Sequence, residues 1–531
     1  MDRYPKGFTE KDAFCILNSL MKSSSPTEKK EKEQIFLVKK KFIERVGLSV
    51  EELDRLNIIH VAGTKGKGST CAFTEQILRG YGFRTGFLSS PHLVSPRERI
   101  RLNGQPISNE LFNKHLVEVF ERLDGTKDAN DGKMPTFGCF FTLLAFWVFL
   151  EEKVEVAVVE VGLGGQYDQT NVIRKPWVCG IALLDMDHTE SLGNTIEEIA
   201  WHKGGIFKPG VPAFTVKQQE GAMAMLRDRA KETGCPLKVC PDLEDYQTDH
   251  SPLLLSLAGK HQHSNASLAL QLSHSWLQRR FQSDESCPTT IAENAGVPRA
   301  ASFKPSPFMV KGLAETVWPG RTQIIKRGNV TYFLDGAHTR RSIQACAEWF
   351  KETSAEHERN ASGPVARVLL FNVSGKRDST ALLKLLVPYQ FDFAVFCPNI
   401  PDSSKICPTD LVNKFVQEEE MMNRCLLNES SWRLLNNQEN KNDTHPLMED
   451  SLSLVPKRKG GSLVFPCIHG ALQWISQGHD PLLTDSTLPV KPSIQDKAVE
   501  LSDAAELHVL VTGSLYLVGG VLKNLEPESY E

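Results

Sequence analysis

The sequence lacks the features that would assign it to a membrane, disulfide-bonded or zinc-binding class. Its longest apolar run, at 137–150 (FGCFFTLLAFWVFL), has 14 residues, whereas a transmembrane helix needs about 20. No C-x-x-C pair occurs among the 12 cysteines, a pattern typical of reduced thiols in a core. We therefore expect the apolar run to be a buried helix and the protein to have no membrane span.

The numbers of positively and negatively charged residues are nearly equal. The 61 Lys and Arg residues stand against 65 Asp and Glu residues, for a net charge of −4, which is not the basic footprint of a nucleic-acid-binding protein. The first residues, MDRYPKGFTEKDAF, contain neither the apolar core of a secretory signal nor an Arg-rich transit helix. As written, the chain is expected in the cytoplasm, and a mitochondrial matrix form would need a longer isoform with a presequence.

The length and composition indicate a folded protein of at least two domains. At roughly 100 to 200 residues per domain, 531 residues exceed a single core. The range 282–311 is rich in Ser, Pro, Thr and Ala without a period, so we expect a linker or insertion there. This division gives an N-terminal domain at 1–300 and a C-terminal domain at 312–531. Polar segments at 418–463 and 477–500 are expected to be mobile loops.

Short apolar, β-branched runs alternate with stretches compatible with helices. Such alternation is typical of α/β domains with mainly parallel sheets. The expected strands are 58–61, 154–161 and 178–184 in the first domain and 330–334, 368–371, 393–396 and 508–512 in the second. The expected helices include 71–79, 195–201 and 342–351.

The glycine-rich segment 62–70 (AGTKGKGST) lies between an expected strand and an expected helix. In such loops, backbone N–H groups surround phosphate oxygens, so Lys67 would reach the β- and γ-phosphates and Ser69 or Thr70 would face Mg²⁺. The segment is a variant of the strict P-loop, because Val61 replaces the first glycine and Gly68 separates Lys67 from Ser69. The alternative interpretation is a glycine-rich surface turn without function.

Five other residues have side chains that could act in binding or catalysis, but each also has an ordinary structural interpretation when taken alone. Glu160 ends an apolar run, where an acid is either functional or a satisfied strand-end carboxylate. Taken alone, His188 is best interpreted as a structural histidine, and Lys203 as a lysine that caps a helix end. Arg321 and Asp335 alone would be a surface arginine and an Asp-Gly turn.

Taken together, the motifs resemble those of the folylpolyglutamate synthases within the Mur ligase superfamily. The variant loop G-T-K-G-K-G-S is similar to the ATP-binding loop of that superfamily. The further blocks that resemble the family, in its order, are S-S-P-H-L at 89–93, R-E-R-I at 97–100, V-E-V-G-L-G-G at 159–165, D-H-T at 187–189, H-K-G-G-I at 202–206, W-P-G-R at 318–321, D-G-A-H at 335–338 and T-G-S-L at 512–515. The likeness is greatest to vertebrate members and extends from about residue 56 to 521.

This resemblance implies an ATP-dependent ligase that adds L-glutamate to the γ-carboxyl of a tetrahydrofolate or its polyglutamates through an acyl phosphate. It also implies a P-loop domain followed by a smaller Rossmann-like domain, with the active site in the cleft between them, and a monomer. Its implied ATP-binding residues are Gly63, Thr64, Lys65, Gly66, Lys67, Gly68, Ser69, Arg321 and Asp335. It implies that Ser69 meets the nucleotide-bound Mg²⁺ and that Ser90, Glu160 and His188 hold a second metal ion. Its implied catalytic residues are Lys67, Lys203 and His338. The resemblance further suggests that Lys203 carries a carbamate and that K⁺ is a second cation.

Two departures from the family's motifs concern the part of the site that is expected to bind the folate. Relatives carry G-G-A-Y-D-C-T-N where this chain has G-G-Q-Y-D-Q-T-N, so Gln166 and Gln169 replace smaller residues. The stretch 135–141 also differs from the family's usual sequence near the pterin pocket, so we assign no pterin contacts. Two alternatives stay open: a dihydrofolate synthase, which applies the same chemistry to dihydropteroate, and a nucleotide-binding relative without catalysis.

Overall fold

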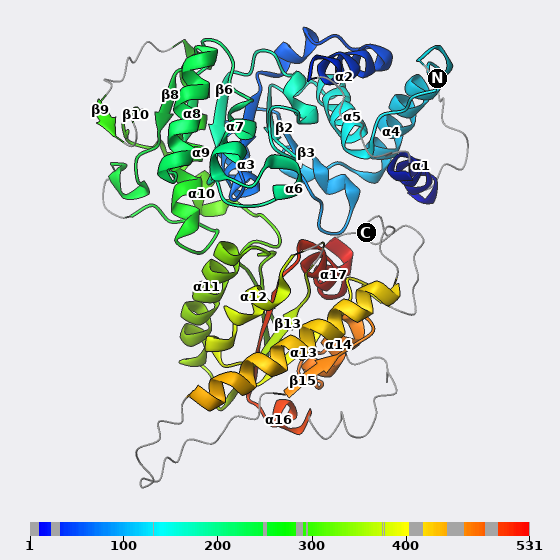
Figure 1. Ribbon diagram of the computed structural model, residues 1–531, viewed down its shortest axis with the longest axis vertical. Coiled ribbons are helices and arrows are strands. Elements are labelled where there is room, and N and C mark those ends of the chain that lie inside the picture. The colour runs from blue at the N-terminus through cyan, green and yellow to red at the C-terminus, as the bar shows by residue number, and fades with distance from the viewer. Residues whose placement is uncertain are drawn as a thin grey trace. The chain divides into compact units, whose positions relative to one another are not determined.

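The computed structural model divides the chain into two compact units, Met1–Val317 and Trp318–Glu531. It describes residues 10–22, 32–130, 132–247, 252–282, 290–293, 296–373, 375, 377–402, 418–442, 461–483 and 498–529. Each unit contains one β-sheet with helices packed against it (Figure 1).

The first unit is built on a ten-stranded sheet with the order β4-β3-β2-β5-β1-β6-β7-β8-β10-β9. Its strands are β1 (Ile59–Ala62), β2 (Thr85–Leu88), β3 (Ile100–Leu102), β4 (Gln105–Pro106), β5 (Val156–Glu160), β6 (Val178–Ile181), β7 (Ala213–Thr215), β8 (Leu237–Val239), β9 (Thr290–Glu293) and β10 (Val297–Arg299). The strands from β2 to β10 in this order pair in parallel, whereas β3, β4 and β9 pair antiparallel at the two edges. The carboxyl ends of β1, β5 and β6 therefore lie side by side, where parallel sheets bind ligands.

The helices of the first unit cover both faces of this sheet. They are α1 (Glu10–Lys22), α2 (Lys32–Val46), α3 (Lys67–Gly80), α4 (Asn109–Asp124), α5 (Phe137–Glu151), α6 (Thr189–Leu192), α7 (Ile196–Gly204), α8 (Glu220–Thr233), α9 (His261–Phe281) and α10 (Pro307–Glu315), with single 3₁₀ turns η1 (Glu52–Leu56), η2 (Pro96–Arg99), η3 (Asp128–Asn130), η4 (Gln169–Val172) and η5 (Leu243–Asp245). On β6, Gly180 faces Leu272 of α9, while Cys179 and Ile181 belong to the core formed with α7 and α8. Because successive strand residues point to opposite faces, α9 lies on one face and α7 and α8 on the other.

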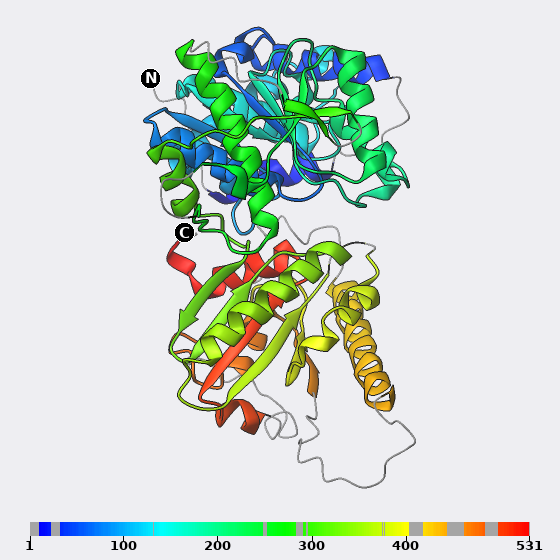
Figure 2. The ribbon, with the colours of Figure 1, turned by 90° about the vertical axis from the view of Figure 1, so that its left-hand side faces the viewer.

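The second unit has a six-stranded sheet with the order β11-β12-β16-β13-β14-β15. Its strands are β11 (Gln323–Arg327), β12 (Val330–Leu334), β13 (Val365–Phe371), β14 (Phe393–Phe396), β15 (Gly461–Val464) and β16 (Glu506–Thr512). All neighbours pair in parallel except β11, which pairs antiparallel with β12. Its helices are α11 (Arg340–Glu358), α12 (Ser379–Lys384), α13 (Glu418–Asn442), α14 (Ile468–Ser476), α16 (Val499–Ser502) and α17 (Leu515–Leu525), with 3₁₀ turns η6 (Val387–Tyr389) and η8 (Pro527–Ser529). Figure 2 shows α11 lying across the strands of this sheet.

The predicted α/β class with mainly parallel sheets is confirmed, and each expected strand overlaps a strand of the structure. The expected buried helix is α5, in which Cys139 to Phe149 are buried. Within the described ranges, no helix is long and apolar enough to cross a membrane.

Of the linker or insertion expected at 282–311, the linker is wrong for the residues that the structure describes there. Val297–Arg299 forms β10, which pairs with β8 and extends the first sheet. Further on, α10 packs against α3, and Gly312 approaches Ile77 of that helix. The boundary between the units therefore falls after Val317 rather than within 282–311.

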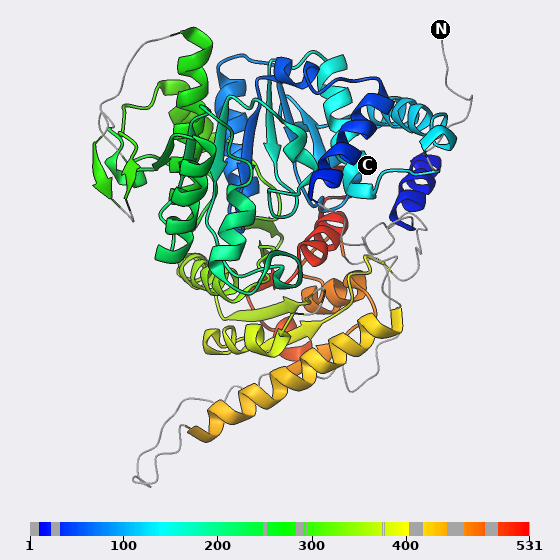
Figure 3. The same ribbon diagram turned by 45° about the horizontal axis from the view of Figure 1, so that its top comes forward.

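The mobile loops expected at 418–463 and 477–500 are partly wrong. Residues 418–442 form the long helix α13, which stands beside the shorter α12 in Figure 3. Its buried residues, Met421, Cys425, Asn428 and Trp432, recur at the spacing of one helix face. Three of these four residues are apolar or sulfur-containing, so packing stabilises a helix whose overall composition is polar. Residues 461–464 form β15 and residues 499–502 form α16, while 443–460 and 484–497 lie outside the described residues.

Candidate active site

The glycine-rich loop connects β1 to the first turn of α3. Gly63 has a φ of +146° and Gly66 a φ of +84°, backbone conformations that side-chain-bearing residues rarely adopt. The backbone N–H groups of Thr64 and Lys65 both donate to the carbonyl oxygen of Leu183, at 2.9 and 3.0 Å. Lys67, Gly68 and Ser69 form the first turn of the 14-residue helix α3. The N–H groups of a first turn have no partner within the helix, so this turn is suited to bind an anion.

Substitution of Gly66 by alanine should weaken ATP binding by at least about tenfold. A Cβ at this position would lie 2.0 Å from Oδ1 of Asn265 on α9, at a positive φ, so both the loop and α9 would have to move. Gly82→Ala is the matched control, because Gly82 has a φ of +90° but nothing within 4 Å of its added Cβ. Nucleotide titration should show normal affinity for Gly82→Ala, and equal affinities in the two variants would contradict this account of the loop.

Glu160, Ser90 and Lys67 meet beside the loop. Glu160 ends β5, pairs in register with Val61 of β1, and is only 6% exposed. One carboxylate oxygen lies 3.9 Å from Nζ of Lys67, and the other accepts a hydrogen bond of 3.2 Å from the backbone N–H of Ser90. The side chain of Ser69 is also buried. A carboxylate with serine hydroxyls supplies the oxygen ligands that Mg²⁺ prefers, so these residues fit that ion.

A second ion pair lies on the neighbouring segment after β6. Nζ of Lys65 contacts Oδ2 of Asp187 at 3.0 Å, and the backbone N–H of His188 donates to the other carboxylate oxygen. His188 itself is exposed at the start of α6, with a φ of 53°. Sequence reasoning assigned no role to Asp187, although its place in the D-H-T block was a signal. Across the part of the chain that is described, no cluster of three or more His, Cys, Asp or Glu residues could hold a metal ion, so the magnesium assignment depends on hydroxyl and phosphate oxygens.

Lys203 is buried in the last turn of α7, with 4% of its surface exposed. Burial is the main cause that lowers its pKa to about 7, and the charge of Lys67 acts in the same direction, while Asp168 and Asp187 oppose the shift. The neutral amine is therefore far more populated at neutral pH than it is for an ordinary lysine. A neutral amine is a nucleophile, unlike an ammonium.

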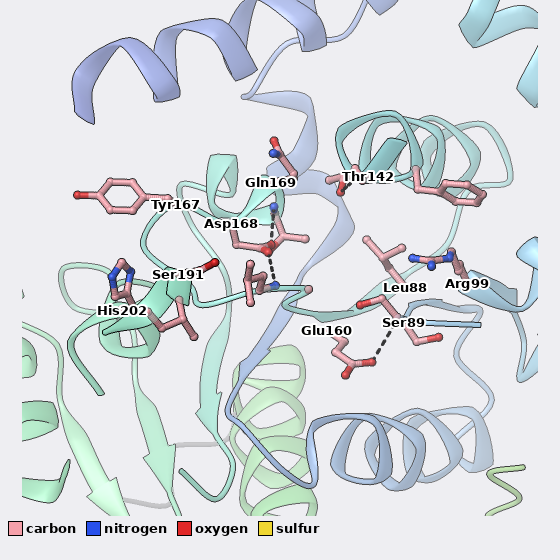
Figure 4. Close-up of a pocket in the computed structure, with 17 residues that line it drawn as sticks. Leu88, Ser89, Arg99, Thr142, Glu160, Tyr167, Asp168, Gln169, Ser191 and His202 are labelled. Carbon is pink, nitrogen blue, oxygen red and sulfur yellow. Dashed lines mark hydrogen bonds between the residues drawn. The ribbon is translucent and has the colours of Figure 1, made fainter. Parts of the chain in front are cut away.

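A cavity of about 410 Å³ opens beside Glu160 and Ser90 (Figure 4). Its wall combines apolar and aromatic side chains, such as Leu88 and Phe141, with the polar groups of Arg99 and Asp168. The remaining lining residues are Ser89, Gly138, Thr142, Gly162, Leu163, Tyr167, Gln169, Thr170, Ser191, Leu192 and His202. An apolar cavity with a few convergent polar groups is typical of small-molecule sites.

The two departures from the family motif lie in different surroundings. Gln169 lines the cavity. Gln166 instead accepts a hydrogen bond of 2.6 Å from Arg229 on α8, and its own backbone N–H donates to His202. Gln169 is therefore the departure that bears on the shape of the cavity.

In the second unit, the D-G-A-H block follows β12 directly. Asp335 is buried, and its two carboxylate oxygens accept hydrogen bonds of 2.9 Å from the backbone N–H groups of Thr322 and Ala337. Arg321 directly precedes Thr322 in the chain, and its guanidinium is 3.0 Å from a Cβ placed on Gly336. His338 is linked through Nδ1 to the carbonyl oxygen of Gly336 at 2.7 Å. The structure thus brings Arg321 beside the turn after β12 that carries Asp335 and His338.

Known proteins resemble this chain over most of its length. No family model matches the chain. The chain is 51% identical over 539 residues to the mitochondrial folylpolyglutamate synthase of Homo sapiens, a match that covers 97% of this chain and 92% of the relative. It is 38% identical over 491 residues to a putative folylpolyglutamate synthase of Caenorhabditis elegans, covering 91% and 85%.

Two solved structures share the fold. The folylpolyglutamate synthase of Mycobacterium tuberculosis complexed with ADP matches with a TM-score of 0.67 and 22% identity, covering 97% of this chain and 99% of the other. The apo form of L. casei FPGS matches with a TM-score of 0.64 and 20% identity, covering 97% of this chain and 99% of the other.

Proposed function

This chain belongs to the folylpolyglutamate synthase family, and from that premise we propose which of its residues carry the reaction. The activity is the ATP-dependent addition of L-glutamate to the γ-carboxyl of a tetrahydrofolate. One observation carries the assignment of residues: Lys67, Glu160 and Ser90 converge where β1 and β5 end and α3 begins. These three residues therefore form the proposed centre of the P-loop ligase that the sequence predicts.

The chemistry requires neutralisation of negative charge in two steps. A folate carboxylate is a poor acyl donor, so one of its oxygens takes the γ-phosphoryl group of ATP and ADP leaves. The amine of glutamate then attacks the acyl phosphate, loses a proton, and displaces inorganic phosphate. Phosphoryl transfer depends on positioning and on cations around the moving group. Lys67 and the backbone of Gly63–Ser69 serve this purpose, with Thr64, Lys65, Gly66 and Gly68 holding the phosphate chain.

Ser69 would meet the nucleotide-bound Mg²⁺, whereas Ser90, Glu160 and His188 would hold a second Mg²⁺ ion. When bound, the ion polarises phosphate oxygens and shields their charge. Glu160 also orients Lys67, since the 3.9 Å separation places opposite charges side by side. In the second unit, we assign Arg321 and Asp335 to the nucleotide and His338 to its phosphates. A K⁺ ion remains a proposal that rests on the family resemblance alone.

Lys203 is proposed to carry a carbamate. Its neutral amine would attack CO₂, form an N–C bond and release one proton, which leaves an anionic oxygen ligand in place of an ammonium. The low pKa of about 7 supports this step, because an amine with an ordinary lysine pKa would be almost entirely protonated at neutral pH.

Carbamylation makes activity depend on CO₂. Protein depleted of bicarbonate should lose most of its turnover and regain it when bicarbonate is restored, with a larger response above pH 7 than below it. Lys203→Ala should be inactive in both buffers. With ¹³C-bicarbonate, a carbamate resonance should be present in the wild type and absent in Lys203→Ala. Full activity of bicarbonate-free wild type, together with no such resonance, would contradict the modification.

The 410 Å³ cavity is proposed to receive the folate ring, since it adjoins Glu160 and combines aromatic with polar walls. The elongated substrate and L-glutamate are the other proposed ligands. We also propose that the protein acts as a monomer. Its proposed location is the cytoplasm, with a mitochondrial matrix form from a longer isoform, in keeping with relatives that are named mitochondrial.

The choice of acyl donor can be tested with two substrates. Purified protein with Mg-ATP and L-glutamate should release phosphate when tetrahydrofolate is present and much less with dihydropteroate. Preference for dihydropteroate would identify a dihydrofolate synthase. Tight ATP binding without turnover on either substrate would identify a nucleotide-binding relative that has lost catalysis.

A further inference from the structure

Lys39 lies on α2, outside every motif described above, and its side chain is only 7% exposed. Its ammonium group donates two hydrogen bonds, to the backbone carbonyl oxygens of Tyr167 and Asp168, each at 2.7 Å. Lysine is rarely this buried without partners. The two bonds therefore join α2 to a loop nearly 130 residues away in sequence.

The two carbonyl groups belong to the wall of the cavity. Tyr167, Asp168, Gln169 and Thr170 are consecutive lining residues. The side chain of Asp168 also braces this loop, because it accepts hydrogen bonds from the backbone N–H groups of Leu163 and Thr170, at 2.8 and 2.9 Å. The loop is thus held by its own carboxylate and, through its backbone, by Lys39.

The geometry defines what Lys39 controls. A carbonyl oxygen lies in the plane of its peptide bond, so two fixed carbonyls fix the peptide planes on either side of Asp168. Those planes set the directions in which the side chains of Asp168 and Gln169 extend from the backbone toward the cavity. Burial lowers the pKa of Lys39 and the charge of Asp168 opposes that shift, but the amine retains at least two N–H donors in either protonation state.

We propose that Lys39 is a positioning residue that sets the shape of the folate pocket by holding the carbonyl oxygens of Tyr167 and Asp168. This inference rests on the proposed function. It predicts an effect on the folate substrate that is separate from any effect on ATP, because the contacts of Lys39 are with the cavity loop.

The test compares two lysines on the same helix. Lys39→Met keeps an unbranched apolar side chain as far as Cε but removes the donors, so it should raise the KM for tetrahydrofolate at least tenfold while the KM for ATP stays within twofold. Lys39→Arg retains paired donors and should raise it less. Lys40→Met is the control, because Lys40 is exposed and pairs at 3.8 Å with Glu44, and it should match the wild type. If Lys39→Met is insoluble, Lys39→Leu, which also has no donors, carries the same expectation.

Hydrogen exchange provides a second readout that does not need turnover. The amides of 163–172 should exchange faster in Lys39→Met, with β1 and α9 unchanged as references. A folate KM within twofold of the wild type, an equal rise of both KM values, or unchanged exchange at 163–172 would overturn the inference. Absence of glutamate-dependent turnover in the wild type would instead refute the proposed function, and the exchange experiment would still decide the role of Lys39.

Discussion

Lys67→Ala should lower the rate of ATP-dependent ligation by about 10³-fold, which corresponds to about 4 kcal/mol of transition-state stabilisation. The lysine begins α3, and its ammonium lies 3.9 Å from Glu160, where the phosphates of ATP are expected. Only 15% of its side chain is exposed, yet alanine is a better helix former, so the fold should persist. The decisive measurement is single-turnover phosphate release alongside thermal unfolding.

One control variant and one further measurement test the role of Lys67. Lys231→Ala removes an exposed lysine of α8, and it should keep both full activity and the unfolding temperature. The charge of Lys67 also lowers the pKa of Lys203, so its removal should raise that pKa, as seen by the pH dependence of Lys203 modification with an amine reagent. A folded Lys67→Ala protein with near-normal turnover would refute the assignment of the loop.

Glu160→Gln should reduce kcat by about 10² to 10³-fold and raise the Mg²⁺ concentration needed for half-maximal turnover by at least about tenfold. The amide has the shape of the carboxylate but loses the charge that faces Lys67 and the metal. Because a buried charge is costly to desolvate, the neutral amide should leave the unfolding temperature unchanged or slightly higher. Magnesium titrations of turnover and calorimetric unfolding measure the two effects.

Glu232→Gln is the matched control for Glu160. Glu232 is exposed and pairs with Arg229 on α8, so its variant should titrate with magnesium like the wild type. A parallel fall in activity and in unfolding temperature for Glu160→Gln would mean that Glu160 is a structural strand-end carboxylate, the alternative left open by the sequence.

The loop at Gly63–Ser69 could be predicted because its signals are local. β-branched residues before the loop, glycines within it and a helix-compatible stretch after it lie in one short segment, and the structure has β1, the loop and α3 there. Glu160 was also predictable, since a charged residue at the end of an apolar run marks the carboxyl end of a buried strand. Its contacts with Ser90 and Lys67 were not, because they arise from the pairing of β1 with β5.

The wrong predictions concern elements that are stabilised by contacts with residues distant in the sequence. The strand β10 has three residues and includes a proline, so its pairing with β8 leaves no periodic signal. In α13, four buried positions among many polar ones support a helix only when the sheet is beside it. Lys39 was missed although a signal existed: it occupies the apolar stripe Ile35, Phe42 and Val46 of α2, where a lysine needs a buried partner.

The most direct test of the account is mass analysis of the folate product after incubation of tetrahydrofolate with Mg-ATP and L-glutamate, using the wild type and Lys67→Ala in parallel. The account predicts a glutamate-dependent gain of one or more glutamyl units with the wild type and no gain with Lys67→Ala. An unchanged folate with the folded wild type, or equal elongation by both proteins, would contradict it.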